Sequence, residues 1–392
     1  MIKPSGSLFR RVLFWAHLTC GVTAGFLILF MSATGVLLTY ERQILAAQAQ
    51  ANRVELPDGA VRLSADQLLE RARAAAPEGV QLSLVFDADP AFPVTAVFGR
   101  EQLLLNPVTG AVLPDAAAGT REFFRTITGW HRWLGGDSAS PGARLIDLSN
   151  LLFVFIILSG IYLWLPPVWK WLGVRGRMLF RSSYMNGKAR DYNWHHAFAF
   201  WMFIPLLLIA VSGVMMSYPW ANKALFAAYG ETPPQRGGPP GGAPANAAAM
   251  NRGASDGAAD IAPAPRATAQ QLLDAARDRI SDWRRISLPA SARGDSIDVS
   301  AELVSDNIRP PRQIVTLSTT DASVLRVSDP PAQTPGQRAR SWIRFVHTGE
   351  EYGVIGQTIA GLASLAACFL FYTGFALAWR RLISPLYKRS NA

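Results

Sequence analysis

The chain has 392 residues, half of them hydrophobic, and a formal net charge of +10. Its 38 Lys and Arg residues are unevenly spread, because 13 of them fall in three short segments, residues 1–11, 165–194 and 378–392, which together contain one acid, Asp191. The other 25 basic residues are balanced by 27 acidic ones, which argues against a nucleic-acid-binding protein with a broad basic surface.

Four apolar runs are long enough to cross a bilayer, which requires about 20 hydrophobic residues. They cover residues 12–40, 145–164, 194–218 and 354–379. The first run follows three basic residues, as the apolar part of a signal peptide does, but it is far longer than the roughly 7 to 15 residues of that part. We therefore expect a retained transmembrane helix, with cleavage after Ala47-Gln48-Ala49 as the alternative.

The clustered positive charge predicts the orientation of the four helices. Lys and Arg concentrate in the loops that stay on the cytoplasmic side of a membrane. Because both termini and the loop 165–194 are basic, we expect them in the cytoplasm, with the protein a multi-pass component of a bacterial inner membrane. Residues 41–143 and 219–351 then lie in the periplasm.

The two periplasmic segments contain the same pattern, which predicts an internal duplication. Residues 63–73 (LSADQLLERAR) and 267–277 (ATAQQLLDAAR) each open with a hydroxyl residue, Ser64 or Thr268, that can cap a helix. Strand-like stretches follow at residues 81–86, 94–98, 102–105 and 111–113 in the first segment, and at 296–300 and 313–318 in the second. We expect two small α+β domains, each with a helix and an antiparallel sheet.

The predicted fold class is therefore an integral membrane bundle of four helices with two small periplasmic α+β domains. A segment rich in Pro, Gly and Ala follows the third apolar run and has few large apolar residues to bury, so we expect it to be flexible. The predicted parts are residues 1–40 (N-terminus and first membrane helix), 41–120 (first periplasmic domain), 121–169 (His-bearing segment and second membrane helix), 170–193 (cytoplasmic basic loop), 194–220 (third membrane helix), 221–266 (flexible segment), 267–335 (second periplasmic domain) and 336–392 (His-bearing segment, fourth membrane helix and cytoplasmic tail).

All five histidines of the chain lie in or beside apolar runs. His17 stands 18 residues before Gly35, and His195 stands 18 residues before Gly213, which is about five helical turns and puts each histidine on the same face as its glycine. His196 does not fit this spacing, so we treat it as the alternative to His195. An ionisable residue in a membrane segment indicates a functional site.

The other two histidines, His131 and His347, lie in aromatic and basic segments that lead into the second and fourth apolar runs. On the predicted topology they form an outer pair at the periplasmic face, and His17 and His195 form an inner pair at the cytoplasmic face. Two histidines at one depth can provide both axial ligands of a haem iron. Tetrahedral zinc requires three or four protein ligands, so zinc or copper transport is less favoured; a purely structural role for each histidine is the remaining alternative.

The two cysteines, Cys20 and Cys368, lie in different apolar runs at different predicted depths, so we expect no disulfide between them. The chain has no Cys-x-x-Cys-His motif for covalent haem attachment. Any haem must therefore be held non-covalently, as haem b.

The sequence resembles the PepSY-associated transmembrane family over nearly its whole length. The motifs that carry this resemblance are His-x-x-x-Gly at the head of the first two membrane helices (His17-Leu-Thr-Cys-Gly21 and His131-Arg-Trp-Leu-Gly135) and pairs of a small residue and glycine farther along the helices (near Ser32, Leu158-Ser-Gly160, Val211-Ser-Gly213 and Tyr372-Thr-Gly374). Two positions depart from the motif: Ala199 replaces the glycine after His195, and His347 is followed by Thr-Gly-Glu. Within the family the chain is most similar to the FoxB-type ferrisiderophore reductases.

This resemblance implies a membrane protein with two haem b groups that passes electrons to ferric siderophores in the periplasm. The inner haem iron would be bound by His17 and His195 and the outer one by His131 and His347. Arg11 is a candidate partner for the propionates of the inner haem. The candidates for the outer haem are Arg132, Arg144 and Arg344.

The electron donor is expected to be a separate cytoplasmic flavoprotein or the quinol pool. A different class of function also fits the sequence, namely a non-enzymatic membrane sensor or regulator whose PepSY-like domains bind a peptide or a protease. A third possibility is an electron-transfer protein whose acceptor is another protein.

Overall fold

The computed structural model describes residues 8–57, 59–166, 170–234, 266–292, 294–305, 310–328 and 333–384. The chain divides into two compact units. The first, which we call the bundle, takes Met1–Ile44, Gly119–Pro233 and Thr334–Ala392. The second, which we call the sheet unit, takes Leu45–Ala118 and Pro234–Gln333.

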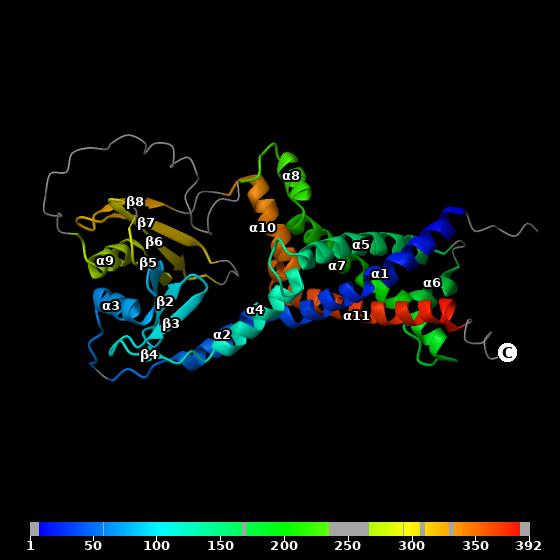
Figure 1. Cartoon of the computed structure of the whole chain (residues 1–392), viewed down its shortest axis with the longest axis horizontal. Helices are drawn as coiled ribbons and strands as arrows, with labels where there is room; N and C mark the ends of the chain where they lie inside the picture. The colour runs from blue at the N-terminus through cyan, green and yellow to red at the C-terminus, as the bar shows by residue number, and fades with distance from the viewer. Residues whose placement is uncertain are drawn as a thin grey trace, which may run out of the picture. The chain divides into compact units, whose positions relative to one another are not determined.

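Four long helices form the body of the bundle (Figure 1). They are α1 (Leu8–Leu38), α5 (Pro141–Trp164), α7 (Gly187–Ser217) and α11 (Gly353–Leu382). α1 packs against α5 and α11, and α7 packs against the same two helices, so α1 and α7 occupy opposite corners. Within the described part of the chain, these are the four helices long and apolar enough to span a membrane, as predicted.

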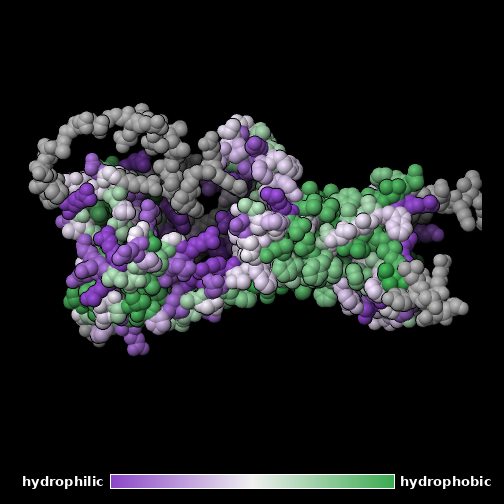
Figure 2. Space-filling model, in the orientation of Figure 1, coloured by the Kyte–Doolittle hydropathy of each residue, from purple (hydrophilic) through white to green (hydrophobic). Residues whose placement is uncertain are grey.

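The sides of the bundle are hydrophobic (Figure 2). Large apolar side chains on each long helix are exposed to the surroundings, among them Phe26, Leu158, Ile204 and Ile355. A protein in water rarely exposes an apolar surface of this extent. The exposed apolar belt therefore agrees with helices that face lipid.

Shorter helices cover the two ends of the bundle. α4 (Ala118–Trp133) and α10 (Pro335–Thr348) lie at one end, and α6 (Trp171–Met178) lies at the other (Figure 1). Side-chain caps set several helix starts: Ser140 caps α5 with Pro141 in its first turn, Asn186 caps α7, and Thr334 forms a capping box with Gln337 in α10. The remaining short elements are α2 (Glu41–Ala49), η1 (Gln50–Asn52), α8 (Pro219–Ala227) and η3 (Glu350–Tyr352).

Two predicted boundaries are corrected by these helices. The predicted loop 170–193 contains α6, and α7 begins within it at Gly187, because the cap by Asn186 starts the helix before the sequence becomes apolar. The predicted flexible segment 221–266 begins inside α8. Residues 235–265 of that segment lie outside the described residues.

The sheet unit contains one antiparallel sheet of eight strands in the order β4-β3-β2-β1-β5-β6-β7-β8. The first half contributes α3 (Ala65–Ala75), β1 (Leu82–Asp87), β2 (Val94–Phe98), β3 (Glu101–Leu105) and β4 (Val112–Leu113). The second half contributes α9 (Ala269–Arg279), β5 (Trp283–Pro289), β6 (Ser296–Leu303), β7 (Arg312–Ser318) and β8 (Val324–Ser328). The matching order of elements agrees with the predicted duplication, which stays a prediction.

The two α+β modules are joined rather than separate, which the sequence did not indicate. β1 pairs with β5, and Arg285 donates a hydrogen bond of 3.1 Å from Nε to Asp87 across this junction. One hydrophobic core includes side chains from both helices and both halves of the sheet, such as Leu68, Leu273 and Ile286. The sheet unit therefore has a single core.

The N-termini of α3 and α9 cap each other. The carboxylate of Asp66 accepts hydrogen bonds from the backbone N–H groups of Ala269 and Gln270, at 2.7 and 3.0 Å. In return, the side-chain oxygen of Gln270 accepts from the backbone N–H of Ala65 at 2.7 Å. Asp66 and Gln270 hold equivalent positions in the repeated pattern. Each module therefore accepts hydrogen bonds from backbone N–H groups at the start of the other module's helix, which have no partner within that helix.

Candidate functional site

Four histidines of the bundle are held in the same way. In each case Nδ1 lies within hydrogen-bond distance of a Ser or Thr hydroxyl on a neighbouring helix. The pairs are His17 with Ser159 (2.9 Å), His131 with Thr34 (2.9 Å), His195 with Thr373 (3.0 Å) and His347 with Ser212 (3.0 Å). Nδ1 of His347 also lies 3.0 Å from the carbonyl of Ile209, three residues before Ser212. The carbonyls at the equivalent place, Ile156, Met31 and Leu370, lie near His17, His131 and His195.

The hydroxyls determine which ring nitrogen carries the proton. Each one donates its single hydrogen to the carbonyl four residues earlier in its own helix, as Thr373 does to Phe369 at 2.7 Å and Ser159 to Phe155 at 2.7 Å. Thr34 and Ser212 do the same with Phe30 and Leu208. A hydroxyl that has donated its hydrogen can only accept, so Nδ1–H of each histidine is the donor. The lone pair is then on Nε2, which is the nitrogen left free to bind a metal.

A glycine next to the hydroxyl makes room for the imidazole in three of the four cases. A Cβ at Gly160 would lie 3.2 Å from Cε1 of His17, and one at Gly374 would lie 3.2 Å from Cε1 of His195. A Cβ at Gly35 would lie 3.6 Å from Cε1 of His131. The first two distances are shorter than ordinary carbon contacts, so these glycines are required for the rings to approach the helix.

The fourth glycine, Gly213, makes room for Asn150 and not for a histidine. A Cβ at Gly213 would lie 2.6 Å from Nδ2 of Asn150, which is buried and donates a hydrogen bond of 3.0 Å to the carbonyl of Ala210. Asn150 thus fixes the contact between α5 and α7 beside the hydroxyl that holds His347.

The outer pair has the separation that two axial ligands require. The ring centroids of His131 and His347 are 6.5 Å apart, with the ring planes at 67°. An imidazole nitrogen lies about 2 Å from a metal that it ligates, so two opposed imidazoles have centroids about 6 Å apart. The centroid separation is therefore that of two imidazoles on one metal. The adjacent rings of His195 and His196 have a similar separation, 6.3 Å, so the distance permits a shared metal but does not by itself assign one.

The outer pair is also held in the neutral form. Burial, and then the nearby His347, lower the pKa of His131 to about 4. Burial likewise lowers the pKa of His347. Neutral imidazole is the form that ligates metals.

The inner pair is carried by the two helices at opposite corners of the bundle, His17 on α1 and His195 on α7. His17 lies nine residues after the start of α1 at Leu8, and His195 lies eight residues after the start of α7 at Gly187. The two side chains are close enough to interact electrostatically. The predicted pairing by depth is thus consistent with their positions.

His196 has a different environment from the four anchored histidines. Its Nδ1 donates a hydrogen bond of 2.8 Å to the carbonyl of Tyr192 in its own helix, and its ring packs on that of Tyr192 with centroids 4.1 Å apart. It contacts no Ser or Thr hydroxyl on a neighbouring helix in the described part of the chain. We therefore retain His195 as the expected ligand.

A dry core separates the two histidine levels. Ile157 of α5, Leu206 and Ala210 of α7, and Ala363 and Ala367 of α11 form a buried apolar cluster in the middle of the bundle. On α1, His17 of the inner level and Thr34 of the outer level are 17 residues apart, which is about 26 Å at 1.5 Å per residue. The same 17 residues separate His195 and Ser212 on α7.

The predicted propionate partners are all exposed: Arg11, Arg132, Arg144 and Arg344. Two of them stack on the aromatic ring that follows in the chain, Arg132 over Trp133 at 4.5 Å and Arg344 over Phe345 at 5.5 Å. Their role toward a haem stays a prediction.

Another arginine lies near the inner pair and was missed. The guanidinium of Arg381 lies 4.6 Å from the ring centroid of Phe14 and 5.5 Å from that of Trp15, both close to His17 in α1. The neighbouring Arg380, together with Arg190, neutralises the fully buried carboxylate of Asp191. The basic end of α11 is thus attached to the start of α7.

Our sequence reasoning missed the anchoring role of the four hydroxyls, although it noted three of the small-residue–glycine pairs that contain them. Each precedes a glycine: Thr34-Gly35, Ser159-Gly160, Ser212-Gly213 and Thr373-Gly374. A Ser/Thr-Gly pair in each of four membrane helices was a signal that could have identified them. We had assigned Gly35 and Gly213 to the histidine of the same helix, but Gly35 lies beside His131.

The ligand set fits a haem better than a multi-histidine metal site. Within the described residues, no group of three or more His, Cys, Asp or Glu side chains is placed to hold a metal ion. Each level offers two imidazoles whose Nε2 atoms make no hydrogen bond within the described part of the chain, and two is the number that a haem iron takes from a protein. Cys20 and Cys368 are both free.

The comparison with known proteins supports the architecture. No curated protein matched the chain. Residues 14–381 match the sequence pattern described as the PepSY-associated TM region, a span that includes all four long helices except for a few terminal residues. The chain therefore belongs to the PepSY-associated transmembrane family.

Proposed function

We propose that this protein carries electrons across the bacterial inner membrane through two haem b groups and reduces ferric siderophores at the periplasmic face. The observation that carries the proposal is the common anchoring of four histidines through Nδ1, which leaves Nε2 of each one to act as a ligand. Metal-ligating histidines commonly donate their other ring N–H to a fixed partner, which sets the tautomer and the ring orientation. The four Ser and Thr hydroxyls do this here.

His17 and His195 would hold the inner haem, and His131 and His347 the outer one. When bound, each haem supplies one-electron redox chemistry. The protein keeps the ligating nitrogens deprotonated, fixes the ring planes through Nδ1, and excludes water from the apolar core between the levels. Exposed arginines at both ends are suited to pair with propionates.

Reduction is sufficient to release iron from a siderophore. Siderophore donors are hard oxygen ligands, which bind Fe(III) much more strongly than Fe(II). The chain then needs only to deliver an electron at the periplasmic surface. The donor, a cytoplasmic flavoprotein or the quinol pool, would act at the inner pair, with both termini in the cytoplasm as the charge distribution predicts.

An absorption spectrum of the purified protein tests this proposal. After expression with sufficient haem, we expect a Soret band and two haems per chain in a pyridine haemochrome assay, with the low-spin spectrum of bis-histidine ligation. A colourless protein that is folded in detergent would contradict the proposal and leave the sensor hypothesis.

A further inference from the structure

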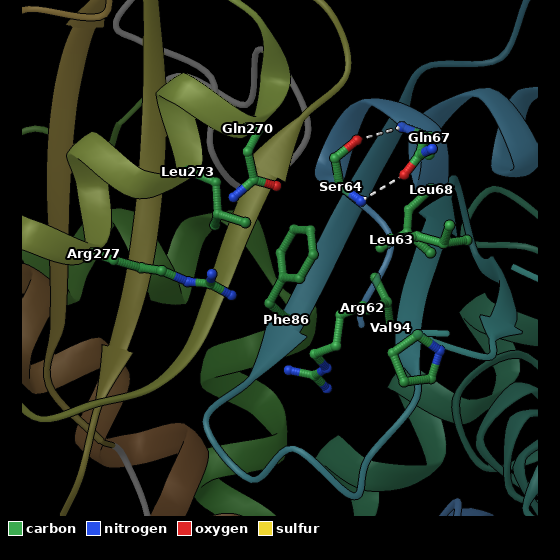
Figure 3. A pocket seen from close by; sticks show the side chains of 11 residues that line it. Arg62, Leu63, Ser64, Gln67, Leu68, Phe86, Val94, Gln270, Leu273 and Arg277 are labelled. Carbon is green, nitrogen blue, oxygen red and sulfur yellow. Dashed lines mark hydrogen bonds between the residues drawn. The ribbon is translucent and has the colours of Figure 1, made fainter. Parts of the chain in front are cut away.

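The sheet unit contains a pocket between its two helices that the proposed electron transfer does not use. Figure 3 shows this pocket, which has a volume of about 350 Å³. Its walls come from α3, α9 and the strands β1 and β2, so both halves of the unit contribute. The volume is within the usual range for small-molecule sites.

One side of the pocket is apolar. Leu68 of α3, Leu273 of α9, Phe86 of β1 and Val94 of β2 line it, and all four are at most 6 % exposed. These side chains belong to the core of the sheet unit. A ligand with an aliphatic or aromatic body would be sheltered from water here.

Two arginines face the same pocket, Arg277 from α9 and Arg62 from the segment before α3. The guanidinium of Arg277 lies 5.5 Å from the ring centroid of Phe86 and 5.4 Å from that of Trp283. Its Nε is buried and has no hydrogen-bond acceptor in the described part of the chain. Such an unsatisfied donor in a charged group is costly unless a ligand completes it.

No acid lines the pocket to neutralise this pair. Asp274, which does not line the pocket, forms an ion pair with Arg277 at 3.9 Å, a distance too long for a hydrogen bond, and its side chain is more than half exposed. Arg62 uses one nitrogen to donate to the carbonyl of Pro90 at 2.8 Å. Burial and the repulsion from Arg62 lower the pKa of Arg277, which Asp274 only partly offsets.

The other polar groups of the pocket already have partners. Ser64 and Gln67 are engaged with each other in the capping box of α3. The Gln270 amide accepts from Ala65 and donates to Asp274. The unmet hydrogen-bonding capacity is therefore that of the guanidinium groups, which donate and carry positive charge, and an anionic acceptor satisfies both requirements.

We propose that this pocket binds a small carboxylate with an apolar body, with the carboxylate between Arg62 and Arg277 and the body against Phe86, Leu68 and Leu273. Guanidinium groups bind carboxylates through paired, charge-assisted hydrogen bonds. The ligand is either a free carboxylic acid or the C-terminal residue of a peptide, because both present the same group. This site is independent of the haem proposal.

Calorimetric titration of the full-length protein in detergent tests the site with three probes. N-acetyl-leucine represents a peptide C-terminus, 4-methylpentanoate represents a free acid, and N-acetyl-leucinamide has the body of the first without the charge. We expect at least one of the two acids to bind. If N-acetyl-leucine binds, N-acetyl-leucinamide should bind at least tenfold more weakly. Binding of only one acid identifies the source of the ligand.

Arginine variants test whether the acid binds in this pocket. Arg277→Gln and Arg62→Gln should each weaken acid binding about tenfold or more, since each variant loses a charge-assisted hydrogen bond to the carboxylate. Arg326→Gln, which removes an exposed arginine of β8 outside the pocket, should bind as the wild type does. A melting curve checks that each variant is folded, and Arg62→Gln decides the question if Arg277→Gln unfolds. The proposal is wrong if neither acid binds, if acid and amide bind equally, or if folded pocket variants keep wild-type affinity.

Discussion

Replacing Thr373 by Val tests the anchoring hydroxyls directly. The Thr373 side chain is fully buried, and its hydroxyl accepts from Nδ1 of His195 at 3.0 Å. Valine has nearly the same shape, so the change removes the acceptor without leaving a cavity. The carbonyl of Leu370 lies near the ring of His195, so it can accept from Nδ1–H once the hydroxyl is gone.

The expected effect on haem binding follows from that remaining contact. Loss of an outer partner of a ligating histidine typically lowers metal affinity by about 10- to 100-fold. Because the nearby carbonyl of Leu370 can replace the lost acceptor, we expect the lower end of this range, about tenfold. The effect should be confined to one haem, since the outer pair is held by Thr34 and Ser212.

Transfer of haem to excess apomyoglobin, followed in the Soret band, measures this loss. Thr373→Val should release one of its two haems about tenfold faster than the wild type, while Thr373→Ser, which keeps the hydroxyl, should not. Thr23→Val is the control, because Thr23 makes the same hydrogen bond to its own helix, to Thr19 at 2.9 Å, and has no hydrogen bond to a histidine in the described part of the chain. If Thr373→Val releases both haems at the rates of Thr23→Val, the hydroxyl does not position the ligand.

Three further predictions concern the histidines themselves. His17→Ala and His195→Ala should remove the same haem, and His131→Ala and His347→Ala the other, as counted by haem content and redox titration; loss of a common haem in His17→Ala and His131→Ala would overturn the pairing. His196→Ala should keep both haems, whereas a His195→Ala variant with two haems would identify His196 as the ligand. In proteoliposomes reduced from the cytoplasmic side, His347→Ala should stop ferrous-iron release from an external chelate while its inner haem is still reduced, and undiminished release would place the reaction elsewhere.

The membrane helices were predictable from sequence because lipid imposes a simple requirement. A span of about 20 apolar residues is needed whatever the helix packs against, and all four predicted runs lie within long helices apart from Thr39, Tyr40 and Tyr218 at their ends. The histidine pairs were proposed by the same reasoning, since depth in a membrane follows from position along a helix. These inferences need no knowledge of which helices are neighbours.

The anchoring contacts were not predictable in this way. His17 meets a hydroxyl 142 residues farther along the chain, and which helix presents that hydroxyl depends on the packing order around the bundle. The spacing of 18 residues paired each histidine with a glycine of the same helix, but the two positions contact different neighbours: His195 contacts Thr373 of α11, whereas Gly213 lies against Asn150 of α5. Helical periodicity shows which residues share one face of a helix. Which faces of different helices contact each other depends on the tertiary arrangement.

The continuous eight-stranded sheet could not be predicted from the sequence for a different reason. β5 begins with Trp283-Arg284-Arg285, and neither arginine is buried, so its first half does not show the alternation that marks a half-buried strand. Its second half, with Ile286 and Leu288 buried, is too short to indicate a strand by itself. β8 has no buried residue at all. These two strands were therefore missed, and with β5 the connection between the two modules.

The positions of the histidines and their hydroxyl partners explain why the inner and outer histidine pairs lie a fixed distance apart. α1 carries the proposed ligand His17 at the inner level and the anchor Thr34 at the outer level, and α7 does the same with His195 and Ser212. In both helices the two positions are 17 residues apart, so the distance between levels is set by the rise of a helix, about 26 Å. The loops and the sheet unit between the helices do not enter this distance. A change in loop length should therefore leave both histidine pairs intact, whereas a one-residue insertion between His17 and Thr34 would rotate one of them by about 100° and disrupt a level.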